Sequence, residues 1–180
     1  MTVRDPLVGA TLAVMPRLVR ACESDPPLAR RVLADFLELR RILSVRTVVA
    51  LATGITDDEL GVLEQLVTEL EHAPVEDGRE ACCAADLAIS RKVLELRPQA
   101  AFSMVTATFD ELIERSRALR MAMYRDPAVN AAAYRAAFSM VTMSADHAEL
   151  GRVLETLMIA FDAELLHAYE RLLEEAAASA

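Results

Sequence analysis

A chain of 180 residues is long enough for one domain with a sizeable core, and its 54% content of hydrophobic residues excludes intrinsic disorder. Its net charge of −9 opposes direct binding to nucleic acid, because the arginines are scattered and form no basic patch. An odd number of cysteines, with Cys82 and Cys83 adjacent, predicts reduced thiols and a cytoplasmic location. The N-terminal residues lack the pattern of a signal peptide, and no apolar stretch approaches the roughly 20 residues of a membrane span.

Helix-capping residues divide the sequence into seven predicted helices joined by short loops. Several predicted starts combine aspartate with proline, since aspartate suits the N-cap and proline suits the first helical position. The predicted helices cover residues 7–22, 25–52, 56–71, 79–97, 98–124, 126–144 and 146–175. No segment alternates with the period of a strand. The whole chain, residues 1–180, is therefore predicted to be a single all-α domain, an antiparallel bundle of six to seven helices.

The heptapeptide AAFSMVT occurs twice, at residues 100–106 and 136–142. Each copy follows a predicted helix start. The phenylalanine and the valine of each copy, Phe102 and Phe138 among them, share a helix face with other apolar residues. The flanking sequences differ, so no longer repeat is present. Both copies are predicted to supply core side chains, and a ligand-binding cassette is the less favoured alternative.

Arg40 is a charged residue in an apolar environment. It lies near the middle of the apolar stripe of its predicted helix, which is formed by Leu33, Phe36, Leu37, Leu43 and Leu51. A buried guanidinium needs a carboxylate or an anionic ligand, because an unpaired buried charge is strongly destabilising. Two interpretations remain open: a structural ion pair with an aspartate or a glutamate, and an anchor for a ligand.

Asp86 is a second such residue. It lies at the centre of an apolar helix face, with Ser90 one turn further on; that face comprises Cys82, Cys83, Ile89, Val93 and Leu94. A carboxylate in this position must pair, bind a cation or become protonated. Asp86 is predicted either to pair with Arg40 across the bundle or to line an internal polar pocket.

Histidine and nucleophile motifs give little indication of catalysis. Glu69-x-x-His72 and Glu164-x-x-His167 match the spacing of di-iron bundles, but both pairs point away from the apolar faces of their helices. They are predicted to be surface residues, which makes a helical carboxylate/histidine metalloprotein a minor alternative. The sequence contains no GxSxG, P-loop or GxGxxG motif, and no cysteine has an evident histidine partner. We therefore predict no catalytic residues and no enzymatic activity.

The order of several segments resembles a known family. The segments are VRDPLVGATLAVMPRLV, LADFLELRRIL, TDDEL, AADLAISRKVLELRPQAAF, DPAVNAAAYRAAF and DHAELGRVLETL. Together they resemble the C-terminal effector-binding (FCD, or FadR-type) domain of GntR-family transcriptional regulators, from about Val3 to Leu173. The resemblance implies an antiparallel helical bundle with an internal ligand pocket, acting as a homodimer. The winged-helix domain that precedes this bundle in the family has no counterpart before Leu7, so DNA is expected to be contacted only through a separate or missing domain.

Many members of that family bind a divalent metal through Asp-x-x-x-His and two later histidines. The matching positions here hold Asp86, Ser90, Ala136 and, for the last ligand, Met158 or Ile159. Since only Asp86 of the ligand set is retained, the resemblance implies no metal cofactor. An alternative alignment that recruits His147 and His167 needs a gap and turns His167 inward.

Loss of the histidines leaves a less polar pocket, as in the acyl-CoA-responsive branch of the family, which also lacks the metal ligands. Methionine suits adaptable apolar sites, and Met140 and Met143 are expected nearby. The expected effector is a fatty acid, an acyl thioester or another carboxylate, with an apolar body and an anionic head that meets Arg40. Effector binding would shift helices, and a DNA-binding domain would report the change. The predicted ligand-binding residues are Arg40, Asp86, Ser90, Ala136, Met140 and Met158. A structural dimerisation bundle with a filled core is the alternative.

Overall fold

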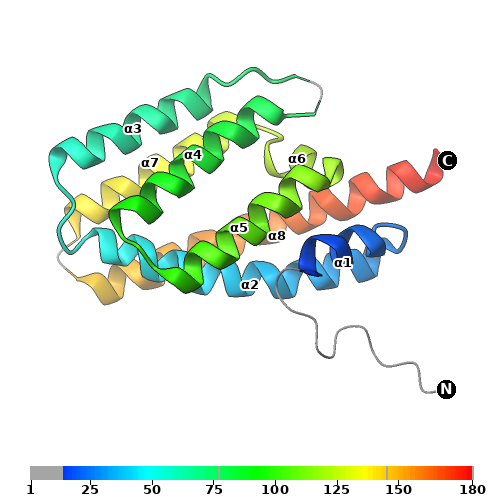
Figure 1. Ribbon diagram of the computed structural model, residues 1–180, viewed down its shortest axis with the longest axis horizontal. Helices are drawn as coiled ribbons and strands as arrows, with labels where there is room; N and C mark the ends of the chain where they lie inside the picture. The colour runs from blue at the N-terminus through cyan, green and yellow to red at the C-terminus, as the bar shows by residue number, and fades with distance from the viewer. Residues whose placement is uncertain (1–13, 77, 145, 180) are drawn as a thin grey trace.

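The computed structural model describes residues 14–76, 78–144 and 146–179, which form eight α-helices and no strand (Figure 1). The helices are α1 (Met15–Cys22), α2 (Pro26–Leu51), α3 (Asp57–Glu71), α4 (Glu80–Leu96), α5 (Ala100–Arg115), α6 (Arg117–Met123), α7 (Pro127–Met143) and α8 (His147–Ala178). The predicted all-α class is confirmed. None of the described helices combines the length and the apolar character needed to cross a membrane.

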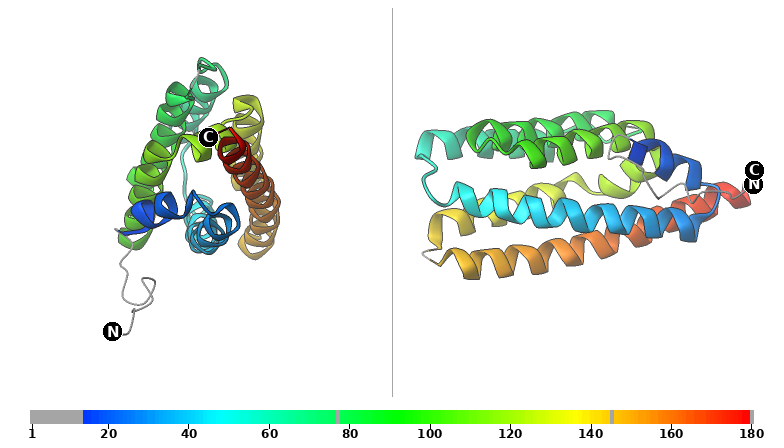
Figure 2. Two further views of the ribbon diagram at one scale, coloured as in Figure 1. Left: turned by 90° about the vertical axis from the view of Figure 1, so that its right-hand side faces the viewer. Right: turned by 60° about the horizontal axis from the view of Figure 1, so that its bottom comes forward.

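The long helices form one antiparallel bundle. Successive long helices run in alternating directions, and α2 and α8 lie side by side along the bundle (Figures 1 and 2). Helix α3 packs on α4 and α7, while α1 packs on α5 and α2. The short helix α6 packs against α8 near one end of the bundle. The space enclosed by α2, α4, α5, α7 and α8 is where the candidate site lies.

Side-chain caps fix most of the helix starts. Asp25, Asp126 and Asp146 each accept a hydrogen bond from a backbone N–H in the first turn of the helix that follows. Thr56 and Glu59 form a complete capping box: the Glu59 N–H lies 3.2 Å from the Thr56 hydroxyl, and the Thr56 N–H lies 2.9 Å from the Glu59 carboxylate. The predicted starts at these four positions are confirmed.

The prediction of one helix over residues 98–124 is wrong, because the helix is interrupted at Ser116, between α5 and α6. Its backbone is extended (φ −104°, ψ 104°), and its hydroxyl accepts from the Leu119 N–H to start α6. The Arg120 guanidinium donates to the last carbonyls of α5, which the break leaves without helical partners. The Ser116 hydroxyl also donates to Glu23 at 2.5 Å. A local cap by Ser116, the bonds of Arg120 and one distant contact, to Glu23 just after α1, therefore stabilise this break.

The outer ends of the bundle differ slightly from the prediction. The predicted start of the first helix at Leu7 lies outside the described residues, and α1 begins at Met15. The last helix continues beyond the predicted end at Glu175 to Ala178.

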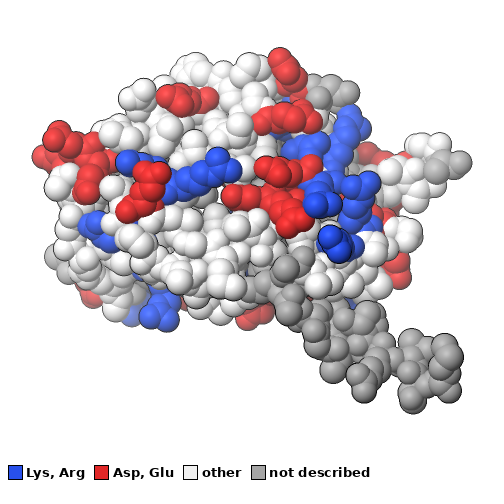
Figure 3. Space-filling view, viewed as in Figure 1, with Lys and Arg blue, Asp and Glu red and all other residues white. Residues whose placement is uncertain are grey.

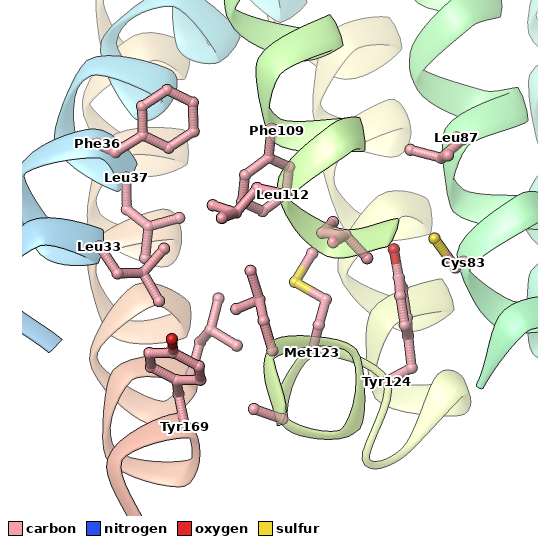
Figure 4. Close-up of a cluster of buried hydrophobic side chains, with 14 of the residues drawn as sticks. Leu33, Phe36, Leu37, Cys83, Leu87, Phe109, Leu112, Met123, Tyr124 and Tyr169 are labelled. Atoms are coloured by element: carbon pink, nitrogen blue, oxygen red, sulfur yellow. The ribbon is translucent and has the colours of Figure 1, made fainter. Parts of the chain in front are cut away.

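The core is continuous along the bundle. Figure 4 shows Leu33, Phe36 and Leu37 of α2 facing Phe109 and Leu112 of α5, and the rings of Phe36 and Phe109 stack at 6.1 Å between centroids. Both copies of AAFSMVT contribute a buried phenylalanine and a buried valine: Phe102, Val105, Phe138 and Val141. The prediction that both copies supply core side chains is confirmed.

The surface shown in Figure 3 carries lysine and arginine side chains interspersed with aspartate and glutamate. Short-range ion pairs, such as Arg115 with Glu111 at 2.8 Å, belong to this mixed pattern. On the viewed face, several lysine and arginine side chains gather toward the right-hand side, where aspartate and glutamate side chains lie beside them.

Candidate ligand-binding cavity

A cavity of about 360 Å³ lies between α2, α4, α5, α7 and α8. Most of its wall is apolar, with contributions from Val48, Val93, Phe102, Phe138, Leu154 and Phe161. Three other wall residues, Ala133 and Ala136 of α7 and Leu157 of α8, are exposed, so the cavity opens to the surface between these two helices. Its volume falls within the range of about 300–1,000 Å³ that is typical of small-molecule sites.

The cavity brings together most of the residues predicted to bind a ligand. Arg40, Asp86, Ser90, Ala136 and Met158 all lie on its wall. Met140 does not: the lining residues of α7 end at Phe138, and Met140 packs, half-buried, against the core beyond them. Met143, which was also expected nearby, is 81% exposed. The expected contribution of these two methionines to the wall is therefore corrected.

Arg40 enters the wall from α2 with much of its hydrogen-bonding capacity unused. Its guanidinium carbon lies 4.4 Å from the centroid of the Phe109 ring, which is a cation–π contact. Its Nε is buried without a hydrogen-bond partner, and its Nη2 lies 3.9 Å from Asp162 Oδ1, too far for a hydrogen bond. Asp162 instead makes its short ion pair with Arg41, at 2.9 Å. Arg40 is thus held in place by packing, and its charge is balanced by Asp162 and Asp86 without a short ion pair to either.

Asp86 is satisfied by two tyrosines and forms no ion pair with Arg40. It is 4% exposed and accepts hydrogen bonds from the hydroxyls of Tyr124 (2.9 Å) and Tyr134 (2.8 Å). Burial raises the pKa of Asp86, and the two hydroxyls and the charge of Arg40 oppose that rise. Burial and the nearby Asp86 charge raise the pKa of both tyrosines, so both remain protonated donors. Figure 4 shows Tyr124 in the core close to Cys83 of α4.

Asp162, Tyr124 and Tyr134 were not among the residues predicted from the sequence to form the site. Asp162 is 3% exposed and lies directly after Phe161 in the apolar stripe of α8, with Leu165 and Leu166 one turn on. Helical spacing alone therefore indicates that Asp162 lies on a buried face of its helix. In the apolar stripe of a helix, a tyrosine is counted as an apolar core residue, although its hydroxyl needs a hydrogen-bond partner when it is buried.

Asp110 is a further acidic residue on the cavity wall that sequence reasoning did not single out. It is half-buried, and its Oδ1 is buried without a hydrogen-bond partner. Burial raises its pKa to about 6; the charge of Arg91 opposes this rise, while the charges of Asp86 and Glu114 add to it. The bundle therefore contains a carboxyl group that is destabilised in its charged form.

Replacing Asp110 with asparagine is expected to stabilise the protein near neutral pH. Because the pKa is higher in the folded state (about 6) than in an unfolded chain (about 3.9), the folded state binds more protons in this window, and wild-type stability falls as pH rises through it. The difference in Tm between Asp110→Asn and wild type should therefore be smallest near pH 4 and grow up to about pH 7. Thermal unfolding across this range checks it, with Glu111→Gln as the control outside the cavity. If the difference in Tm between Asp110→Asn and wild type does not change with pH, the raised pKa of Asp110 is contradicted.

The histidines lie away from the cavity. His72, His147 and His167 are exposed, as are Glu69 and Glu164. The predicted surface position of both Glu-x-x-His pairs is confirmed, and the alternative alignment that turns His167 inward finds no support. Within residues 14–76, 78–144 and 146–179, no three His, Cys, Asp or Glu side chains are grouped so that they could hold a metal ion.

No family model, curated protein or solved structure matches the chain. The resemblance to the FadR-type effector domain therefore stays a prediction from the sequence. Any function assigned to the chain has to be supported by the cavity and the groups on its wall.

Proposed function

We propose that this chain is an effector-binding domain of the kind found in FadR-like GntR-family regulators, and that its cavity binds a small organic acid. The ligand has an apolar body, which the aliphatic and aromatic wall accommodates, and a carboxylate or similar anionic head, which binds Arg40. In this role the domain has no catalytic activity. It acts as a homodimer, and it influences DNA through a separate winged-helix domain.

The observation that carries this proposal is the incomplete pairing of Arg40. Its Nε has no partner, and its nearest carboxylate oxygen lies 3.9 Å away. An arginine binds a carboxylate through two parallel, charge-assisted hydrogen bonds, which are stronger than neutral ones. The ring of Phe109 holds the guanidinium on the wall, so less side-chain entropy is lost when a ligand binds. An anionic head group would therefore supply the hydrogen-bond acceptors that the Arg40 guanidinium lacks.

The cavity also favours a binding role over the alternative of a purely structural dimerisation bundle. A scaffold gains stability when its interior is filled, because unfilled volume destabilises a core by about 24 cal/mol per Å³. Here the wall retains small residues, including Ala133, Ala136 and Ala137, beside an opening between α7 and α8. Small side chains at that opening are consistent with entry of a ligand.

Titration with acids of increasing chain length tests the proposal. Octanoate should raise the Tm more than butyrate or acetate, because a longer chain buries more apolar surface in the cavity. Arg40→Gln should weaken octanoate binding by about 10- to 100-fold, in line with the loss of hydrogen bonds to a charged group. Isothermal titration calorimetry gives the dissociation constants.

Arg41→Gln is the matched control for this experiment. Arg41 is the neighbouring residue and pairs with Asp162 more closely than Arg40 does, but it does not line the cavity. Its substitution should lower stability and leave octanoate affinity within about threefold of wild type. If both substitutions weaken binding equally, or if no acid raises the Tm of wild type, the proposed function is wrong.

A further inference from the structure

We propose that Asp110 is a second polar contact for the ligand, which is therefore an apolar carboxylic acid that also carries a hydrogen-bond donor, a hydroxyl or an amino group, close to its carboxylate. This inference rests on the proposed function, since it specifies the class of acid that the same cavity binds. It is carried by the position of Asp110, by its unpaired oxygen and by the distribution of polar groups on the wall.

Asp110 and Arg40 both line the cavity, from the neighbouring helices α5 and α2. Asp110 follows Phe109, whose ring contacts Arg40 of α2. Asp110 itself interacts with the charges of Asp86 and Arg91 of α4 and of Glu114 of α5, while Asp86 also interacts with Arg40. Asp86 is thus near both groups. A ligand that occupies the cavity can meet Arg40 with its carboxylate and Asp110 with a donor substituent, because both residues line it.

The carboxyl group of Asp110 lacks the partners that satisfy Asp86. Two tyrosine hydroxyls donate to Asp86, whereas Asp110 Oδ1 is buried with no partner. The terminal torsion of aspartate is broad and roughly two-fold, so rotation about it can exchange the two oxygens and turn Oδ1 toward the cavity that Asp110 lines. A buried acceptor without a donor is destabilising, and a donor on the ligand would remove that penalty.

The charges on the wall also disfavour a plain fatty acid. Asp86 and Asp110 both border the cavity, and Arg40 is the basic residue on its wall. A simple carboxylate adds negative charge beside two acidic groups. A hydroxyl or ammonium group facing Asp110 offsets this effect.

The apolar part of the ligand is expected to point away from these charges. Arg40, Asp86 and Asp110 come from α2, α4 and α5, whereas Ala133, Ala136, Leu157 and Met158 at the opening come from α7 and α8. Because the charged groups on the wall come from α2, α4 and α5, we place the donor near the carboxylate of the ligand, at its second or third carbon.

Calorimetry with octanoate, 2-hydroxyoctanoate, 3-hydroxyoctanoate and 2-aminooctanoate tests the inference on the full chain. At least one substituted acid should bind wild type about 10-fold more tightly than octanoate does, and the hydroxyl and amino arms show which donor is preferred. This gain should shrink in Asp110→Asn, which keeps one acceptor oxygen, and vanish in Asp110→Leu. Glu111→Gln, whose glutamate lies outside the cavity, should keep the full gain.

The outcomes separate this inference from the proposed function. If octanoate binds in an Arg40-dependent way but no substituted acid binds more tightly, the role of Asp110 is wrong and the proposed function stands. The role of Asp110 is also wrong if the gain survives in Asp110→Leu. If no acid binds wild type, both are overturned. Circular dichroism shows whether Asp110→Leu folds; if it does not, the wild-type ratios and Asp110→Asn provide the test.

Discussion

Asp86→Leu is expected to lower the free energy of unfolding by about 2–4 kcal/mol, because it leaves two buried hydroxyls without an acceptor. The hydroxyls of Tyr124 and Tyr134 lie 2.9 Å and 2.8 Å from the Asp86 carboxylate. Tyr124 is fully buried, so water cannot replace the lost acceptor there. Urea denaturation measures the change through its midpoint, and an unchanged slope would show that the unfolded state is unaffected.

A triple variant shows whether the unpaired hydroxyls cause the loss. Asp86→Leu combined with Tyr124→Phe and Tyr134→Phe replaces the whole network by apolar groups of similar shape. Such complete replacement is often close to neutral, whereas removal of one partner is not. The triple variant should therefore recover most of the stability that the single substitution loses. Equal destabilisation of both would mean that the shape of the leucine, and not the orphaned hydroxyls, is responsible.

The sequence was most informative where structure depends on neighbouring residues. The capping box of Thr56 and Glu59 and the aspartate caps at Asp25, Asp126 and Asp146 each use partners within one helical turn, so their helix starts could be predicted. The break at Ser116 also has a local cap, on the Leu119 N–H, but its hydroxyl donates to Glu23 in another part of the chain, and no local pattern indicates that partner.

The candidate site follows the same division. Arg40 and Asp86 could be singled out because a charged residue inside an apolar stripe needs a partner or a ligand. Which partner each residue has depends on how the helices pack. Asp162 of α8 lies near Arg40, whereas Tyr124, at the end of α6, and Tyr134 of α7 donate to Asp86. Asp110 lies next to Phe109 on α5, and only the folded structure, in which it lines the cavity and its Oδ1 is buried without a partner, distinguishes it from an ordinary surface carboxylate.

Ala137→Leu is expected to have opposite effects on stability and on binding. Ala137 is half-buried on the cavity wall, and a leucine there adds three carbon atoms inside a space of about 360 Å³. Filling a cavity commonly stabilises a protein by about 0.5–2 kcal/mol, which corresponds to a Tm rise of about 1–8 °C for a chain of this size. The same atoms occupy room that the apolar body of the ligand needs. Affinity for the best-binding acid should fall by about 100-fold or more, as measured by calorimetry.

Ala132→Leu separates this effect from a general effect of leucine on α7, because Ala132 is exposed and does not line the cavity. That variant should leave both the Tm and the affinity close to wild type. If Ala137→Leu lowers the Tm, the wall is packed too closely to hold a ligand without rearrangement. If it raises the Tm and leaves affinity unchanged, the acid binds elsewhere. A rise in stability together with a loss of affinity is the result that distinguishes a binding cavity from a packing defect, because a defect can be filled without loss of function and a binding cavity cannot.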